Sequence, residues 1–239
     1  MAKAVKLKVK LISYTQDSEE TVTAAIRQCY SSVGAEQLVK KIDQQTQKRL
    51  IKLVMASGHT STIEHASFTF AIEGISRACS HQLVRHRIAS FSQQSQRYVS
   101  LEKEEMTYII PPKISHSKGK KERFEKLMNR VEENYRKLIK AGVAPEDARF
   151  ILPNATETKI VVTMNARSLT NFFRLRTCTR AQWEIRALAY AMMRLVKKVA
   201  PLLFANVGPS CQVEKICWEG KLTCGRWKNI AGARLKKRS

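Results

Sequence analysis

Segments with strand character are few in this chain and lie far apart. Apolar residues alternate with lysines over residues 5–11, residues 67–72 alternate again, and residues 159–164 are rich in β-branched side chains. Both patterns are typical of strands. Helical and strand patterns mix without regular β–α alternation, and we find no repeat or linker. We therefore predict one α/β domain of the α+β type over residues 1–239, with a mixed sheet, several long helices and an irregular basic tail from about residue 205.

Apolar spacing and end signals predict the helices. Helices are expected over residues 18–30, then one or two further helical turns within residues 38–54, then helices over residues 76–85, 124–138, 145–149 and 182–201. Gly74 is expected to make the turn into the third of these. Gly58 and Gly142 follow two of the helical patterns and are plausible C-terminal glycines. Residues 115–121 form a polar segment that we expect to be a mobile connector.

The chain is strongly basic. It has 43 Lys and Arg against 20 Asp and Glu, a net charge of +23, while 44% of its 239 residues are hydrophobic. Such a charge attracts anions in general, so nucleic acid, phosphorylated metabolites and polyglutamate tails all fit. Lysine-rich residues 113–126 and the run 234–238 are expected to be solvated surface.

The cysteines and the N-terminus bear on the compartment. No apolar signal region opens the chain and no run reaches membrane-spanning length, so we expect a cytoplasmic protein with free thiols and no membrane partner. Cys211, Cys217 and Cys224 lack the close C-x-x-C pairs of a zinc ribbon. Free thiols are therefore favoured, and no metal site is predicted.

Residues 85–98 carry the strongest functional signal. They contain three arginines, a histidine, three serines and three glutamines, and no acid occurs between Glu73 and Glu102. A solvated helix face would mix charges of both signs. Arginine guanidinium groups beside hydroxyl and amide donors suit a phosphate-bearing ligand, since a guanidinium binds two phosphate oxygens at once. A basic patch for nucleic acid is the alternative.

Two further polar segments accompany this one. Residues 165–180 contain four arginines and no acid until Glu184. Residues 58–65 place small hydroxyl side chains between His59 and His65, whose spacing does not put them on one helix face. A metal-binding histidine pair is therefore not expected there.

These three segments resemble the flavin-dependent thymidylate synthases, the ThyX-type enzymes. The pattern Arg-His-Arg-x-x-Ser-x-x-x-x-Ser-x-Arg has every fixed position filled. It is filled by Arg85, His86, Arg87, Ser90, Ser95 and Arg97. Residues 58–65 are similar to the family's Gly-His-x-Ser/Thr-x-x-Glu-His segment, and residues 165–176 to its Asn-Ala-Arg-Ser-Leu-x-Asn-Phe-x-x-Leu-Arg segment. The resemblance extends from about Gly58 to Ala191.

The resemblance implies a ThyX-like fold and a reaction. The reaction is the reductive methylation of dUMP to dTMP in nucleotide biosynthesis, with 5,10-methylenetetrahydrofolate as carbon donor. FAD, reduced by NADPH, supplies the hydride. The implied catalytic group is Arg176, which would stabilise negative charge on the uracil ring. The route needs no cysteine nucleophile, so Cys178 is assigned no attack. A homotetramer with active sites shared between subunits is also implied.

The same resemblance assigns binding residues. The FAD-binding set is His59, Ser61, Arg85, His86, Arg87, Gln93, Asn165, Ala166, Arg167 and Asn171. The dUMP-binding set is Gln82, Leu83, Val84, Arg85, Gln93, Gln94, Ser95, Gln96, Arg97, Arg149 and Arg176. Gln82 also lies one helical turn before Arg85, on the same face.

The sequence departs from the family pattern in places. Gln93 stands where many members have Glu, and Arg180 where many have His, while the tail after Phe204 departs most. Two other functions remain open: an inactive nucleotide-binding homologue and a nucleic-acid binder. Against the binder, aromatic residues make up only 7% of the chain and are scarce in the basic clusters, so nucleic acid is not the expected partner.

Overall fold

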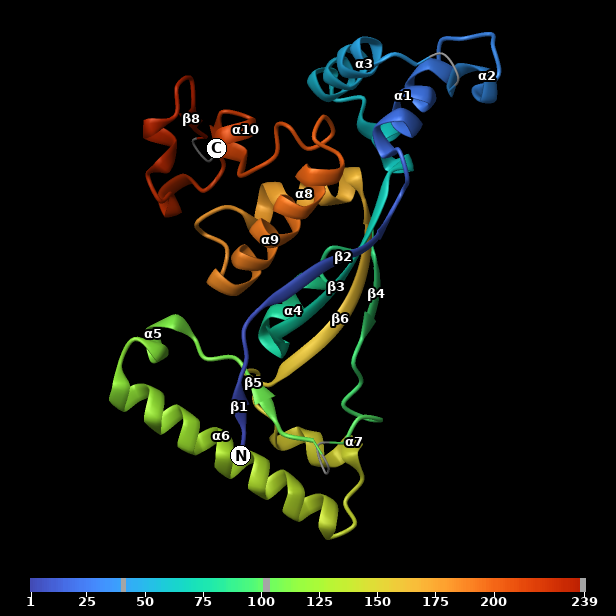
Figure 1. The fold of residues 1–239 in the computed structure, drawn as a ribbon. Helices are drawn as coiled ribbons and strands as arrows, with labels where there is room; N and C mark the ends of the chain where they lie inside the picture. The colour runs from blue at the N-terminus through green and yellow to red at the C-terminus, as the bar shows by residue number, and fades with distance from the viewer. Residues whose placement is uncertain (40–41, 101–103, 237–239) are drawn as a thin grey trace. The chain divides into compact units, whose positions relative to one another are not determined.

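The computed structural model describes residues 1–39, 42–100 and 104–236 (Figure 1). These residues form two compact units, each built from segments distant in sequence. The first unit comprises Met1–Lys8, Ala71–Arg85 and Phe91–Val161, and the second Val9–Phe70, His86–Ser90 and Val162–Ser239. Helices and strands mix without regular alternation, which confirms the α+β class. One domain over the whole chain stays a prediction.

A four-stranded sheet contributes strands to both units. Its order is β2 (Lys8–Tyr14), β3 (Ser67–Ser76), β6 (Glu157–Asn165) and β4 (Ser90–Gln93). β3 and β6 are antiparallel: the hydroxyls of Thr69 and Thr163 are 2.9 Å apart, and the Gly74 amide donates to Glu157 Oε1 at 2.7 Å. Side chains alternate along β3, with Phe68, Phe70 and Ile72 buried.

Gly74 lies inside β3, so its predicted role in a turn is wrong. Its φ of 68° is left-handed, and a Cβ built there would lie 2.0 Å from the Lys6 carbonyl oxygen. Glycine is therefore required by backbone conformation and by space. The helix α4 (Arg77–Leu83) begins three residues later, where Ser76 Oγ accepts a hydrogen bond from the Cys79 amide at 3.0 Å.

A long amphipathic helix packs against short strands in the first unit (Figure 1). The elements are β1 (Lys3–Ala4), β5 (Thr107–Tyr108), α5 (Pro112–Ser115), α6 (Lys118–Lys140), α7 (Pro145–Ala148) and the 3-10 turn η2 (Arg149–Ile151). β1 and β5 pair in parallel. Met106, Tyr108 and Met128 form the core beneath α6, and Phe124 packs against them. The apolar spacing thus identified a core face, as expected.

The second unit holds most of the helices. They are α1 (Ser18–Gln28), α2 (Ala35–Val39), α3 (Gln44–Ser57), the 3-10 helix η1 (Thr60–His65), α8 (Ala166–Arg176) and α9 (Trp183–Val199). Phe68 and Phe173 each pack edge to face against Phe204 in its core, with centroid distances of 5.3 and 6.1 Å. Glu19 Oε1 accepts the amide hydrogens of Leu202 and Leu203 at 2.5 and 3.3 Å, which links α1 to the turn after α9.

The tail contains only short elements. They are α10 (Ser210–Val213), β7 (Ile216–Cys217), η3 (Gly220–Leu222), η4 (Arg226–Asn229) and β8 (Arg234–Leu235). β7 and β8 pair in parallel. The predicted basic run 234–238 continues into residues 237 and 238, which lie outside the described residues.

Several predicted boundaries are wrong. The first long strand covers Lys8–Tyr14 rather than residues 5–11, and the connector predicted at 115–121 is mostly helical, since α6 begins at Lys118. The helix predicted over residues 76–85 is shorter, since α4 ends at Leu83 before Arg85. Gly58 and Gly142 end their helices with φ of 78° and 88°, as predicted.

The lysines at positions 113, 118, 120, 121 and 126 are exposed, which confirms them as solvated surface. Within the part of the chain that the structure describes, no helix is both long enough and apolar enough to cross a bilayer.

Candidate functional site

Arg176 and His86 meet in the second unit. Nε of Arg176 donates to Nε2 of His86 at 3.0 Å, and the His86 ring packs edge-on to Phe172 with centroids 4.9 Å apart. Burial, and then the positive charge of Arg176, lowers the pKa of His86 to about 4. His86 is therefore neutral near pH 7, with its proton on Nδ1 and Nε2 as the acceptor. The contact joins the first arginine-rich segment to the second.

The position of Arg176 follows from how α8 is held. The Asn165 side chain caps the helix by accepting from the Ser168 amide at 2.8 Å, and the Ala166 amide donates to the Ala66 carbonyl at 2.8 Å. Leu169 and Phe172 are fully buried on its inner face. Arg176 is the last helical residue, so a helix fixed at its N-terminus and along one face presents it.

The N-terminus of α8 also meets η1. Arg167 Nη1 lies 2.5 Å from Glu64 Oε1, in a pair that is about half exposed. His59 and Ser61, the other predicted cofactor residues of this region, are exposed beside Glu64 on or next to η1. The absence of acids within residues 165–180 therefore did not mean unneutralised charge, because Glu64 and, at Arg174, Glu214 come from other segments.

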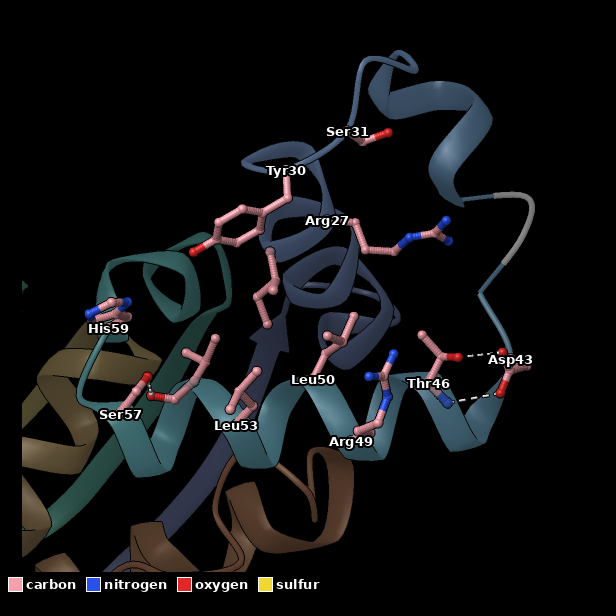
Figure 2. Close-up of a pocket in the computed structure, with 12 residues that line it drawn as sticks. Arg27, Tyr30, Ser31, Asp43, Thr46, Arg49, Leu50, Leu53, Ser57 and His59 are labelled. Atoms are coloured by element: carbon pink, nitrogen blue, oxygen red, sulfur yellow. Dashed lines mark hydrogen bonds between the residues drawn. The ribbon is translucent and has the colours of Figure 1, made fainter.

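A wide hollow lies between α1 and α3 in the same unit (Figure 2). Its volume is about 770 Å³. Leu50 and Leu53 line it along α3, with Arg27 and Arg49 as its cations and His59 at the end near η1. His59 is the one predicted site residue on its wall. The hollow thus combines apolar and cationic surface beside the predicted cofactor segment.

Gln93 is held by two hydroxyls in the first unit. Its Nε2 donates to Ser80 Oγ and to Thr158 Oγ1, both at 3.0 Å. Ser80 Oγ itself donates to the Arg77 carbonyl at 2.9 Å, so it can only accept from Gln93. Ser90–Gln93 is the strand β4, the last strand of the four-stranded sheet. Gln93 is therefore positioned by a sheet rather than by a loop.

Arginines from three segments gather near α7 in the first unit. Arg97 Nε lies 2.8 Å from Glu146 Oε2, and Arg149 Nε donates to the Glu146 carbonyl at 3.0 Å. Burial, and then the charge of Arg149, lowers the pKa of Arg77. The structure therefore brings together the predicted substrate residues Arg97 and Arg149. It adds Arg77, which the sequence reasoning missed because Arg77 precedes the signature.

The remaining predicted residues divide between the units. Gln82, Leu83, Val84, Arg85, Gln94, Ser95 and Gln96 belong to the first unit. Gln94, Ser95 and Gln96 line a small hollow together with Lys159, and the Gln94 amide donates to the Lys159 carbonyl at 2.9 Å. Arg85 is exposed and Leu83 is fully buried, so the Leu83 side chain serves the core. Arg87 and Asn171 belong to the second unit, and both are exposed.

In the residues the structure describes, no three side chains of His, Cys, Asp or Glu surround a common point as a metal ion requires. All six cysteines are free.

These features define a class: an α+β protein with clustered arginines and a neutral imidazole, suited to anionic ligands. A family model described as "Thymidylate synthase complementing protein" matches residues 10–202. A flavin-dependent thymidylate synthase of Geobacter sulfurreducens is 52% identical over 92% of this chain and 94% of its own length, and one of Clostridium tetani is 49% identical over 94% and 95%. The chain belongs to the flavin-dependent thymidylate synthase family, as its three sequence motifs predicted.

A solved structure shares the fold. The UMP/dUMP methylase PolB of Streptomyces cacaoi, crystallised with 5-Br dUMP, has a TM-score of 0.74 and 24% identity over 85% of this chain and 95% of its own.

Proposed function

We propose that this chain converts dUMP to dTMP by reductive methylation, with FAD as cofactor, NADPH as its reductant and 5,10-methylenetetrahydrofolate as carbon donor. The names of its relatives support the flavin, and the nucleotide named with PolB supports the substrate. The proposal includes a cytoplasmic homotetramer with shared active sites. The observation that carries it is the Arg176–His86 contact, which gives the predicted catalytic arginine a fixed orientation.

The chemistry of uracil explains what Arg176 does. Carbon 5 of the ring is a poor nucleophile, and it becomes reactive when negative charge on the ring is stabilised. Arg176 supplies a permanent cation for that charge, and a well-placed donor of this kind contributes ~3–4 kcal/mol to transition-state stabilisation. His86 orients the guanidinium without neutralising it, because an uncharged imidazole accepts a hydrogen bond and adds no negative charge.

The cofactor residues of the second unit fit a flavin with a diphosphate. Ser61, Arg87 and Arg167 offer exposed hydroxyl and guanidinium donors, and the N-terminus of α8 adds a positive dipole end. The only acid paired with them in a described contact is Glu64. When bound, FAD supplies the hydride of the reaction. The chain's own residues bind its phosphates and orient it.

The arginines near α7 are assigned to the phosphate of dUMP. Arg97 and Arg149 converge on Glu146, and Arg77 lies close enough to Arg149 for their charges to repel. A phosphate dianion among three guanidinium groups relieves that repulsion and accepts charge-assisted hydrogen bonds. On this proposal, Arg97 exchanges its exposed pair with Glu146 for the phosphate, at little cost because exposed pairs contribute ~0–1 kcal/mol.

Purified full-length protein tests the proposal. We expect a flavin absorption spectrum that changes when dUMP is added, and formation of dTMP in the presence of NADPH and 5,10-methylenetetrahydrofolate. Flavin binding without dTMP formation would indicate an inactive homologue and refute the catalytic proposal. A colourless protein that refuses FAD and shifts labelled RNA would indicate the nucleic-acid binder that the charge of +23 allows.

A further inference from the structure

Four of the six cysteines line one small cavity in the second unit. Cys178 lies between α8 and α9, Cys211 in α10, Cys217 in β7 and Cys224 just before η4. The cavity has a volume of about 20 Å³. A single water needs roughly 10–15 Å³ measured in this way, so there is room for about one water or one ion. The fold thus gathers soft metal-binding side chains around a space of atomic size.

The backbone around two of these cysteines points N–H groups at sulfur. The Arg180 amide donates to Cys178 Sγ at 3.5 Å, a bond from residue i+2 to residue i. Cys224 repeats this arrangement, since the Thr179 side chain and the Arg226 amide both form hydrogen bonds with it. N–H groups aimed at sulfur stabilise the thiolate form, which is the form that binds metals.

Neighbouring polar groups complete the surroundings. Arg226 lines the cavity and brings a positive charge beside the four cysteines. Trp227 also lines the cavity, and its indole Nε1 is buried with no hydrogen-bond partner among the described residues. An indole N–H needs an acceptor when buried. A thiolate that binds a metal would be such an acceptor, because it carries more negative charge than a thiol.

We propose that Cys178, Cys211, Cys217 and Cys224 form a binding site for one thiophilic divalent cation, with Zn²⁺ as the expected ion. Four thiolates in a tetrahedron with Zn–S distances of about 2.3 Å are a common structural zinc site. In the present rotamers the four sulfurs do not form a coordination shell. Rotation about the Cα–Cβ bonds moves each sulfur relative to the cavity that all four side chains line.

The binding step involves protons and no electrons. Each S–H bond breaks, its proton passes to solvent, and a Zn–S bond forms, so neither metal nor sulfur is oxidised or reduced. Metal binding therefore releases protons into solution and is stronger at higher pH.

The site would have a structural role. Cys178 lies two residues after Arg176, whereas the other three cysteines belong to the tail. A shared ion would fix the tail to the segment that directly follows the predicted catalytic arginine. The inference does not rest on the proposed reaction, since metal content is measured without any assay of activity.

The test uses the full chain, untagged and reduced with a phosphine. After incubation with Zn²⁺ and gel filtration, we expect one zinc per chain by mass spectrometry, with about four protons released on binding. Co²⁺ should give the intense near-ultraviolet bands of cobalt–thiolate bonds. Cys178→Ser and Cys217→Ser should lose most of the bound metal, whereas the control Cys29→Ser should keep it, because Cys29 is exposed and lies outside the cavity.

Two results would overturn the proposal. One is a reduced wild-type chain that takes up no stoichiometric zinc and shows no cobalt–thiolate bands. The other is Cys178→Ser or Cys217→Ser retaining one zinc per chain. If a variant fails to fold, as judged by circular dichroism, the wild-type cobalt titration decides. Disulfides among these cysteines that persist under the phosphine would also count against the site.

Discussion

Nε of Arg176 donates a hydrogen bond to Nε2 of His86 at 3.0 Å, although 90 positions separate the two residues in the chain. Each residue depends on the other: the histidine fixes the direction of the guanidinium, and the arginine helps to keep the histidine neutral. The pair is the centre of the proposed chemistry.

Replacing Arg176 by Ala should strongly slow catalysis and leave cofactor binding intact. We expect FAD binding to persist and dTMP formation to fall by roughly 10²–10³-fold, the usual loss for one charge-stabilising donor. Arg176→Lys should not restore activity, because an ammonium cannot reproduce the planar fork. The control is Arg194→Ala, on an exposed position of α9. Turnover of Arg176→Ala within a few-fold of wild type would contradict the assignment.

His86 predicts how stability depends on pH. Its folded pKa of about 4 lies below the ordinary value of 6.5, so between these two values the unfolded chain binds more protons than the folded one. The free energy of unfolding should therefore rise from pH 4 to 6.5, with no further contribution from His86 above that. Urea unfolding at pH 5 and pH 7.5 should show a smaller difference for His86→Asn than for wild type. The control His116→Asn, at an exposed site, should keep the wild-type difference.

Gln93 is a departure that the structure explains. Ser80 Oγ has already given its proton to the Arg77 carbonyl, so it can accept from an amide but has nothing to donate to a carboxylate. We expect Gln93→Glu to lower the free energy of unfolding by about 1–2 kcal/mol at pH 8. The loss should shrink at pH 5, because the pKa of the new carboxyl is raised and its protonated form can donate. Equal loss at both pH values would show that Ser80 reorients.

The sequence predicted the long elements better than their ends. Apolar spacing identified the helix that proved to be Lys118–Lys140, but its first turn is basic and polar, so that turn was assigned to a connector. Gly74 was taken for a turn because a strand interior seldom contains glycine. A glycine is needed at position 74 because the Lys6 backbone approaches it closely. Lys6 lies far away in the sequence, so this contact leaves no local signal.

The candidate site, too, was predicted only in part: the sequence named its residues but not their partners. The family resemblance named Arg97, Arg149, His86 and Arg176, and the structure pairs the last two directly. Spacing could not supply the partners Glu64 and Glu146, since ion pairs between distant segments depend on tertiary structure. It also separated Cys178 from the tail cysteines, although they line one cavity.

Gly74 and Gly58 form a matched pair of substitutions. Both have positive φ, but a Cβ at Gly58 would meet nothing within 4 Å, whereas at Gly74 it would meet the Lys6 backbone. Gly58→Ala should cost about 1–2 kcal/mol of unfolding free energy from the backbone conformation alone. Gly74→Ala adds the overlap and should cost roughly 3 kcal/mol or more. Urea unfolding of the two variants compares them, and equal costs would exclude the overlap.

The assignment of the arginines near α7 to the phosphate predicts how their replacement changes the KM for dUMP. Arg97→Gln and Arg149→Gln should each raise the KM for dUMP by ~10–100-fold, the loss of one charge-assisted hydrogen bond. FAD binding should not change, since neither residue is assigned to the cofactor. Arg130→Gln, on the exposed surface of α6, serves as control. An unchanged KM in both variants would place the phosphate elsewhere.

Glu19 Oε1 accepts hydrogen bonds from the backbone amides of Leu202 and Leu203. Leu202 is the last residue of the family-matching region 10–202, and Leu203 follows it. The helix α1, near the start of that region, is therefore hydrogen-bonded to the end of the region. Shortening the protein after Phe204 would leave these hydrogen bonds in place, so the closure of the family-matching region does not depend on the tail.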